Sequence, residues 1–248
     1  RGNGAERPRS ARRLTARHAD DGFVWQALGI ALSMQGKEAL FALQRTAALL
    51  PRDPQAHSNL GSALSDAGRH AEAEASCRRA LALYPDYADA LTNLGRALRG
   101  LGRFEEAAVC YRRALELDPH SAETHNNLGN TLKEIGQIAE ARACYEQALV
   151  LRPLYADAHS NLGKLLQQQI GQQERALACF QRALSIVPGS SDALNGIGVL
   201  LHDLNRLDEA LDYFHQALAV DPLNAEAHNN LGIVLKSSGK LTEAVLSY

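Results

Sequence analysis

Residues 122–155 read AETHNNLGNTLKEIGQIAEARACYEQALVLRPLY, and residues 156–190 repeat the pattern as ADAHSNLGKLLQQQIGQQERALACFQRALSIVPGS. Each segment carries a Leu-Gly pair, and such a pair, once with Ile for Leu, returns every 32 to 35 residues. The seven pairs are Leu28-Gly29, Leu60-Gly61, Leu94-Gly95, Leu128-Gly129, Leu162-Gly163, Ile197-Gly198 and Leu231-Gly232. A fixed period of this length predicts a solenoid, in which each unit buries its apolar face against its neighbours.

Apolar residues within each period are spaced by three or four positions, which is the spacing of one helix face. Leu132 follows Gly129 by three positions, and the second half of that period carries Ala141, Tyr145 and Ala148. A proline then ends the period, because proline cannot continue a helix. These prolines are Pro85, Pro119, Pro153, Pro188 and Pro222. The pattern predicts an all-α fold, an α-solenoid of tandem helical hairpins.

These residues resemble the tetratricopeptide repeat, whose W-x2-L-G pattern is matched from Trp25-x2-Leu28-Gly29 onward. The resemblance covers nearly the whole chain and implies a right-handed α-solenoid. Three departures fall at the expected turns between helices, where length changes are tolerated best. Two residues are missing between Gly36 and Ala39, one is added within 167–171, and Asn205 stands where Gly is usual.

We divide the chain at the expected start of each hairpin. Residues 1–21 are expected to form an N-terminal capping helix segment. The repeats then run 22–53, 54–87, 88–121, 122–155, 156–190, 191–224 and 225–248. Because Tyr248 holds the position of Tyr111 and Tyr145, the seventh repeat is truncated halfway along its second helix. We therefore expect a fragment of a longer protein.

The composition indicates an ordinary globular protein. The chain is 46% hydrophobic with a formal net charge of −2, so nothing in it favours nucleic acid or an anionic membrane as a partner. No apolar run approaches the roughly 18 residues of a transmembrane helix. The basic opening stretch lacks the apolar core of a secretory signal. We expect a cytoplasmic protein with neither nucleic-acid nor membrane partners.

Cysteine and histidine recur at fixed repeat positions without forming a metal or disulfide pattern. Three of the four cysteines, Cys110, Cys144 and Cys179, share one position, and Cys77 lies one position later in its repeat. Neighbouring repeats lie about 10 Å apart, a helix diameter, which exceeds the Cα separation of a disulfide. Histidines hold the position of Trp25 in four repeats, too far apart for two to bind one ion. These are His57, His125, His159 and His228, expected to be half-buried packing residues.

No motif of a catalytic site occurs in the sequence. There is no G-x-S-x-G, no H-E-x-x-H, and no G-x-G-x-x-G after a strand. We therefore predict no catalytic residue, no cofactor and no enzymatic activity for this chain.

An asparagine precedes the Leu-Gly pair in five of the seven repeats, with Ala27 and Gly196 as the exceptions. Helical spacing places it on a stripe with the residues four before, three after and seven after it. This stripe is polar, which indicates a wet surface. The candidate binding residues on it are Asn59, Asn93, Asn127, Asn161 and Asn230, together with Asn130 and Lys164.

An asparagine side chain both donates and accepts, so it can pair with the C=O and N–H of one peptide unit. Repeats about 10 Å apart would meet an extended chain, at roughly 3.3 Å per residue, every third residue. The stripe therefore predicts a ladder that binds extended polypeptide by its backbone. The alternative is that these asparagines cap or solvate locally and recur because the repeats were duplicated.

Segments 122–129 (AETHNNLG) and 225–232 (AEAHNNLG) resemble the superhelical domain of the O-linked N-acetylglucosamine transferase family, as does the opening stretch 15–25. The resemblance implies that first helices line a concave groove, where an asparagine ladder guides protein substrates to a downstream catalytic domain. No residue of a sugar-nucleotide site is recognisable, so the chain would be the noncatalytic part of such an enzyme.

A competing hypothesis is an assembly scaffold that holds folded partners or associates with itself. The last, incomplete helix has an apolar side with no visible cover, on which Leu241 and Val245 lie.

Overall fold

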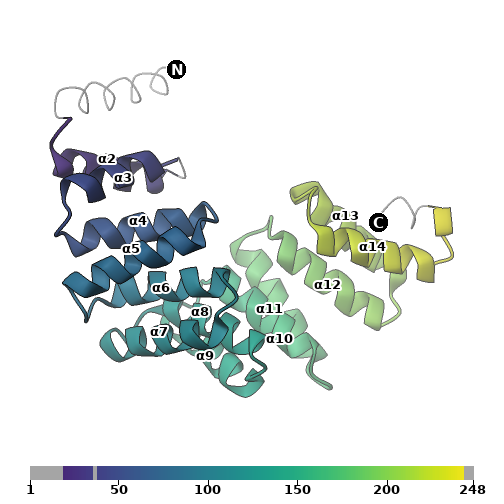
Figure 1. Ribbon diagram of the computed structural model, residues 1–248. Coiled ribbons are helices and arrows are strands. Elements are labelled where there is room, and N and C mark those ends of the chain that lie inside the picture. Colours follow the sequence, from purple (N-terminus) through teal and green to yellow (C-terminus); the bar gives the residue numbers. More distant parts are fainter. Residues whose placement is uncertain (1–18, 36–37, 243–248) are drawn as a thin grey trace. The chain divides into compact units, whose positions relative to one another are not determined.

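The structure is a computed structural model that describes residues 19–35 and 38–242. Over these residues the chain forms thirteen α-helices and no strand (Figure 1). Residues 1–18 of the expected capping segment, the turn residues 36–37, and residues 243–248, which include Val245, lie outside this range. The helices are α2 (Gly22–Ser33), α3 (Leu40–Leu49), α4 (Pro54–Asp66), α5 (His70–Leu83), α6 (Ala88–Gly100), α7 (Phe104–Leu117), α8 (Ala122–Glu134), α9 (Ile138–Leu151), α10 (Ala156–Gln167), α11 (Gln173–Ile186), α12 (Ser191–Asp203), α13 (Leu207–Val220) and α14 (Ala225–Ser237).

The helices pair into hairpins within two compact units, Arg1–Thr131 and Leu132–Tyr248. In the first unit α2 packs on α3, α4 on α5, and α6 on α7; in the second, α10 packs on α11 and α12 on α13. Second helices also contact the first helix of the next hairpin, as α5 does with α6 and α13 with α14. First helices also contact one another directly: α4 contacts α6, α10 contacts α12, and α12 contacts α14. The predicted all-α solenoid is confirmed.

The glycine of the Leu-Gly pair marks the closest approach between the helices of a hairpin. A Cβ on Gly95 would lie 2.7 Å from Cε1 of Tyr111, and one on Gly198 would lie 2.7 Å from Cε1 of Phe214. Both rings are fully buried. Only a residue without a side chain lets the ring pack there, which explains why the pair recurs.

The turns inside the hairpins require a left-handed backbone. Gly102, Gly136 and Gly171 have φ of 74°, 79° and 77°, a conformation that costs glycine little. Asn205 takes the same role in the sixth repeat with φ of 57°. Asparagine adopts positive φ more readily than most other non-glycine residues, so the turn at Asn205 keeps the backbone conformation of the other repeats.

The recurring histidines link four of the first helices, α4, α8, α10 and α14, to the turn before them. Nε2 of His125 lies 3.0 Å from the carbonyl oxygen of Pro119, and His57, His159 and His228 make the same contact at 3.0 to 3.1 Å with the proline six residues earlier. The indole of Trp25 donates to the carbonyl of Ala19 in the same way. Because a carbonyl only accepts, Nε2 carries the hydrogen. These side chains are therefore hydrogen-bonded as well as half-buried.

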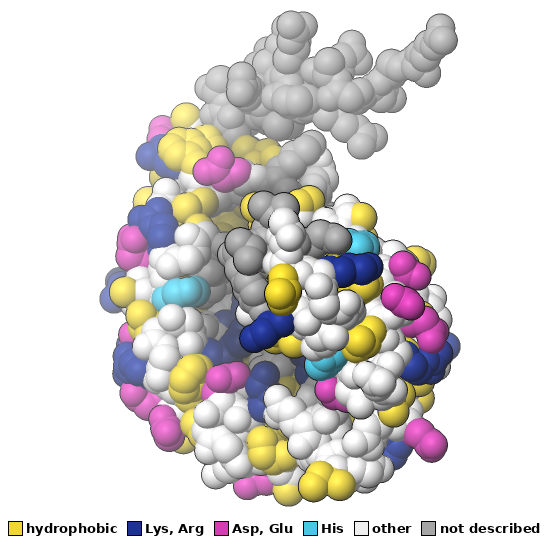
Figure 2. Space-filling view, turned by 90° about the vertical axis from the view of Figure 1, so that its right-hand side faces the viewer, with side chains coloured by type: hydrophobic (Ala, Val, Ile, Leu, Met, Phe, Trp, Pro, Cys, Tyr) yellow, Lys and Arg dark blue, Asp and Glu magenta, His cyan; other side chains and the backbone are white. Residues whose placement is uncertain are grey.

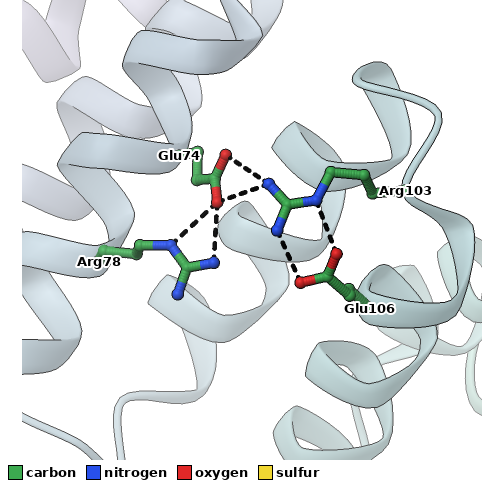
Figure 3. A network of polar contacts seen from close by, with 4 residues as sticks. All are labelled: Glu74, Arg78, Arg103 and Glu106. Atoms are coloured by element: carbon green, nitrogen blue, oxygen red, sulfur yellow. Dashed lines mark hydrogen bonds and ion pairs between the residues drawn. The ribbon is translucent and has the colours of Figure 1, made fainter.

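A charged network joins two second helices (Figure 3). Glu74 of α5 accepts from Arg78 at 2.8 and 2.9 Å and from Nη1 of Arg103 at 2.9 Å, and Arg103 also holds Glu106 at 2.6 and 2.7 Å. Burial alone would raise the pKa of Glu74, whose side chain is 17% exposed, but the hydrogen bonds from Arg78 and Arg103 hold it below its ordinary value.

Removing one histidine contact should destabilise the protein. We expect His125→Ala to lower the free energy of unfolding by about 1 kcal/mol, because the Pro119 carbonyl loses its intramolecular donor. Urea denaturation followed by circular dichroism measures this. The matched control is His215→Ala on α13, whose side chain is exposed and should change stability by less than about 0.5 kcal/mol. Equal effects of the two changes would contradict the role given to His125.

Acid should weaken the Glu74 network. A carboxyl whose folded pKa is lowered stabilises the fold above its unfolded pKa, about 4.3 for Glu, and this stability is lost as the pH falls through the folded pKa. The wild type should thus exceed Glu74→Gln in urea midpoint at neutral pH, with a gap that closes below about pH 4. Glu105→Gln, at an exposed position of α7, is the charge-matched control. A gap that does not depend on pH would be the contrary result.

Candidate functional site

The five ladder asparagines lie at one position of the first helices α4, α6, α8, α10 and α14, and each is partly exposed. The leucines after them, such as Leu94 and Leu128, are buried, whereas residues four positions before them, such as Asp89 and Glu123, are exposed. The asparagines therefore stand at the border between core and solvent. Asn130 and Lys164 are also partly exposed, one turn further along.

Asn93 is held by the preceding repeat. Its Nδ2 donates to Oγ of Ser58 at 3.1 Å and to the carbonyl oxygen of Ser58 at 3.3 Å. Ser58 is 1% exposed and stands immediately before Asn59, the ladder residue of its own repeat. Nδ2 of Asn93 is thus turned toward α4, and neither of these two contacts uses Oδ1.

The second unit repeats this contact. Nδ2 of Asn230 donates to Oδ1 of Asn195 at 3.0 Å. Asn195 is 1% exposed and holds the position in its repeat that Ser58 holds in the second. The same inter-repeat hydrogen bond therefore fixes a ladder amide in each of the two units.

The pattern is broken at two junctions, and a buried polar atom is left there. Nδ2 of Asn59 has no hydrogen-bond partner among the described residues; Gln26, which holds the position of Ser58 in the first repeat, donates its Nε2 to Asp53. Oγ of Ser160 likewise has none, because the residue opposite it is Gly196. A Cβ on Gly196 would lie 2.3 Å from Cζ of Phe180, so close packing leaves no room for a ladder side chain.

The structure places Lys164 in ion pairs. Its Nζ lies 3.1 Å from Oδ1 of Asp192 on α12 and 3.8 Å from Oε2 of Glu226 on α14. A ligand carboxylate would have to compete with these two groups. Arg96 holds the same position in the third repeat, where it donates to Oγ of Ser62 at 3.2 Å and pairs with Asp66.

Sequence reasoning missed Ser58, Asn195 and Arg96. A signal for the first two was present, since a polar residue stands two positions before the Leu or Ile of the Leu-Gly pair in the second to seventh repeats. These residues are Ser58, Thr92, Asn126, Ser160, Asn195 and Asn229.

Other chemistries find little support in the part of the chain described. Within residues 19–35 and 38–242, no group of three or more His, Cys, Asp or Glu could hold a metal ion. Burial raises the pKa of Cys77 to about 12, and it also raises the pKa of Cys110 and Cys179, so these thiols are poor nucleophiles. None of the described helices combines the length and apolar character needed to cross a bilayer. Figure 2 shows basic and acidic side chains interspersed on the face in view.

Solved structures similar to this chain have the same fold. A chain of the APC/C hetero-tetramer Cut9–Hcn1 superposes with a TM-score of 0.81 at 19% identity over 93% of this chain, which spans 46% of that chain's length. MamA gives 0.52 at 26% identity over 62% of this chain and 90% of its own. YrrB, a TPR protein described as having an unusual peptide-binding site, gives 0.55 at 22% identity over 75% and 95%. No curated protein matches the chain.

Family models agree with the structural likeness. Models described as tetratricopeptide repeat match residues 53–120, 110–143 and 165–215, and one described as TPR repeat matches 129–169 and 198–239. Together these matches run from residue 53 to residue 239 without a gap. The chain therefore belongs to the tetratricopeptide-repeat family, whose repeats form protein-interaction modules.

Proposed function

We propose that this chain binds extended polypeptide segments through the ladder asparagines of its first helices. The observation that carries the proposal is the set of five partly exposed carboxamides at one repeat position, two of which are fixed in the same orientation by the preceding repeat. Carboxamides match the backbone of a peptide whatever its side chains are. The ligand class is therefore defined by extended conformation more than by sequence.

We further propose that the chain is the substrate-recognition part of a protein O-glycosyltransferase in the cytoplasm. Support comes from the resemblance of residues 122–129 and 225–232 to the O-linked N-acetylglucosamine transferase family. Tetratricopeptide repeats are generally noncatalytic, so the transfer of sugar would require residues outside this chain. The ladder would line a concave groove and present substrate segments to that catalytic part.

Exposed apolar side chains favour a second candidate function, an assembly scaffold. Val109, Val150 and Leu223 are 64%, 72% and 90% exposed, and Leu241 is 62% exposed. Single exposed apolar residues are ordinary on a monomer, so they carry less weight than an ordered set of amides. A scaffold would hold folded partners or copies of itself through such residues.

The ladder is tested by replacing Asn93, Asn127 and Asn161 together with Ala. If each contributes about 1 kcal/mol of hydrogen bonding, affinity should fall roughly 100-fold, and by a similar factor for peptides unrelated in sequence. Fluorescence anisotropy with labelled, unstructured peptides of a dozen residues measures this, and circular dichroism checks that helicity is kept. The control is Val109→Ala with Val150→Ala, which should leave affinity unchanged.

Unchanged affinity in the triple variant would refute the ladder. The scaffold would gain support if, in addition, self-association or capture of a folded partner were lost when Leu241 or Val245 is replaced by Asp. Analytical ultracentrifugation of the wild type and these variants supplies that measurement.

A further inference from the structure

We infer that the ladder amides of Asn93 and Asn230 bind backbone N–H groups of the peptide through Oδ1, and that Ser58 and Asn195 are the positioning residues that impose this orientation. The inference rests on the proposed function and specifies which peptide group the ladder reads. It differs from the expectation that each asparagine pairs with both the C=O and the N–H of one peptide unit.

The orientation of Asn93 follows from the two acceptors that Ser58 supplies. Both contacts are made by Nδ2, and one of the acceptors is a backbone carbonyl, which cannot donate. Turning the amide over would place Oδ1 against that carbonyl oxygen. Ser58 is 1% exposed, so water does not compete for either acceptor. Nδ2 of Asn93 is thereby turned toward Ser58, and Oδ1 is the amide atom that these two contacts leave for a ligand.

Asn230 is oriented by a side chain. Its Nδ2 donates to Oδ1 of Asn195, an acceptor that is buried and belongs to the preceding repeat. One N–H of Asn230 is used in this bond, and Oδ1, the other polar atom of the planar carboxamide, takes no part in it. Asn195 thus positions Asn230 as Ser58 positions Asn93, in a different unit and with a different residue type.

An acceptor ladder has a defined selectivity. A peptide position that faces Asn93 or Asn230 should carry an N–H, so proline and N-methylated residues bind more weakly there. An ester in place of the amide should weaken binding too, because it keeps the side chain but lacks the donor. A peptide carbonyl opposite Asn93 has to compete with Ser58 for the N–H groups of that amide.

Ser160 provides a matched control within the chain. It holds the repeat position of Ser58, it is 4% exposed, and it faces Gly196, which has no amide to orient. Removing its hydroxyl should leave peptide selectivity unchanged, whereas removing the acceptor from Asn195 should alter it. A general loss of stability would lower the affinity of a variant for the amide, ester and thioamide peptides alike.

The test uses the peptide that binds the full chain most tightly in the anisotropy measurements. Each backbone N–H is replaced in turn by an ester oxygen, and each C=O is weakened by thioamide substitution. The wild type should lose about 3- to 10-fold in affinity at the ester positions that face Asn93 and Asn230. Those losses should vanish in Asn93→Ala and Asn230→Ala respectively, and thioamide effects should be the same in the wild type and the Asn93 variant.

The positioning role is tested by Asn195→Ala. In this variant, ester substitution at the peptide position that faces Asn230 should no longer lower the affinity. Asn195→Ser, which restores a short acceptor like that of Ser58, should recover part of the penalty, and Ser160→Ala should leave the wild-type pattern. Two results would overturn the inference and leave the ladder itself standing. One is a thioamide effect that disappears in Asn93→Ala as fully as the ester effect does, and the other is an ester effect that is the same in Asn195→Ala as in the wild type. Peptide binding that is insensitive to all the asparagine changes would overturn the proposed function as well.

Discussion

The close approach of the two helices in each hairpin is the constraint on which the rest of the structure depends. Gly95, Gly163 and Gly198 leave space that the rings of Tyr111, Phe180 and Phe214 fill completely. Aromatic side chains bury some 150–250 Å² each, so these contacts dominate the apolar burial of a hairpin. In the first two hairpins Leu43 and Cys77 take the place of the ring against Gly29 and Gly61. Because the glycine packs against a buried side chain in each of these five hairpins, the same face of each first helix is turned away from the core, and the asparagine position lies at its border.

The period predicted most of the fold, because each repeat carries the same helical spacing of apolar residues and the same turn positions. Asn205 shows how far those rules extend: it replaces the usual glycine and still adopts a positive φ in the same turn. Contacts between repeats were harder to predict. Lys164 reaches Glu226, which lies two repeats further along, and such a pairing depends on small rotations between repeats that no single repeat encodes.

The candidate site could be located from the sequence, but its hydrogen bonding could not. Spacing placed Asn93 on a polar stripe, yet its partner Ser58 lies 35 residues earlier on another helix. Two of the buried atoms that lack a hydrogen-bond partner among the described residues, Nδ2 of Asn59 and Oγ of Ser160, have the same origin. Asn59 faces a glutamine turned elsewhere and Ser160 faces a glycine, and each unmade hydrogen bond costs about 1–3 kcal/mol.

The histidine contacts and the asparagine contacts differ in how they would respond to the exchange of whole repeats. The bond from His125 to Pro119 spans six residues and travels with its own segment. The bond from Asn230 to Asn195 joins two segments, so it survives only when compatible neighbours stay adjacent. Duplication or recombination of repeats in such a gene would preserve folding while reshuffling which amides are oriented, and ligand preference could diverge faster than architecture.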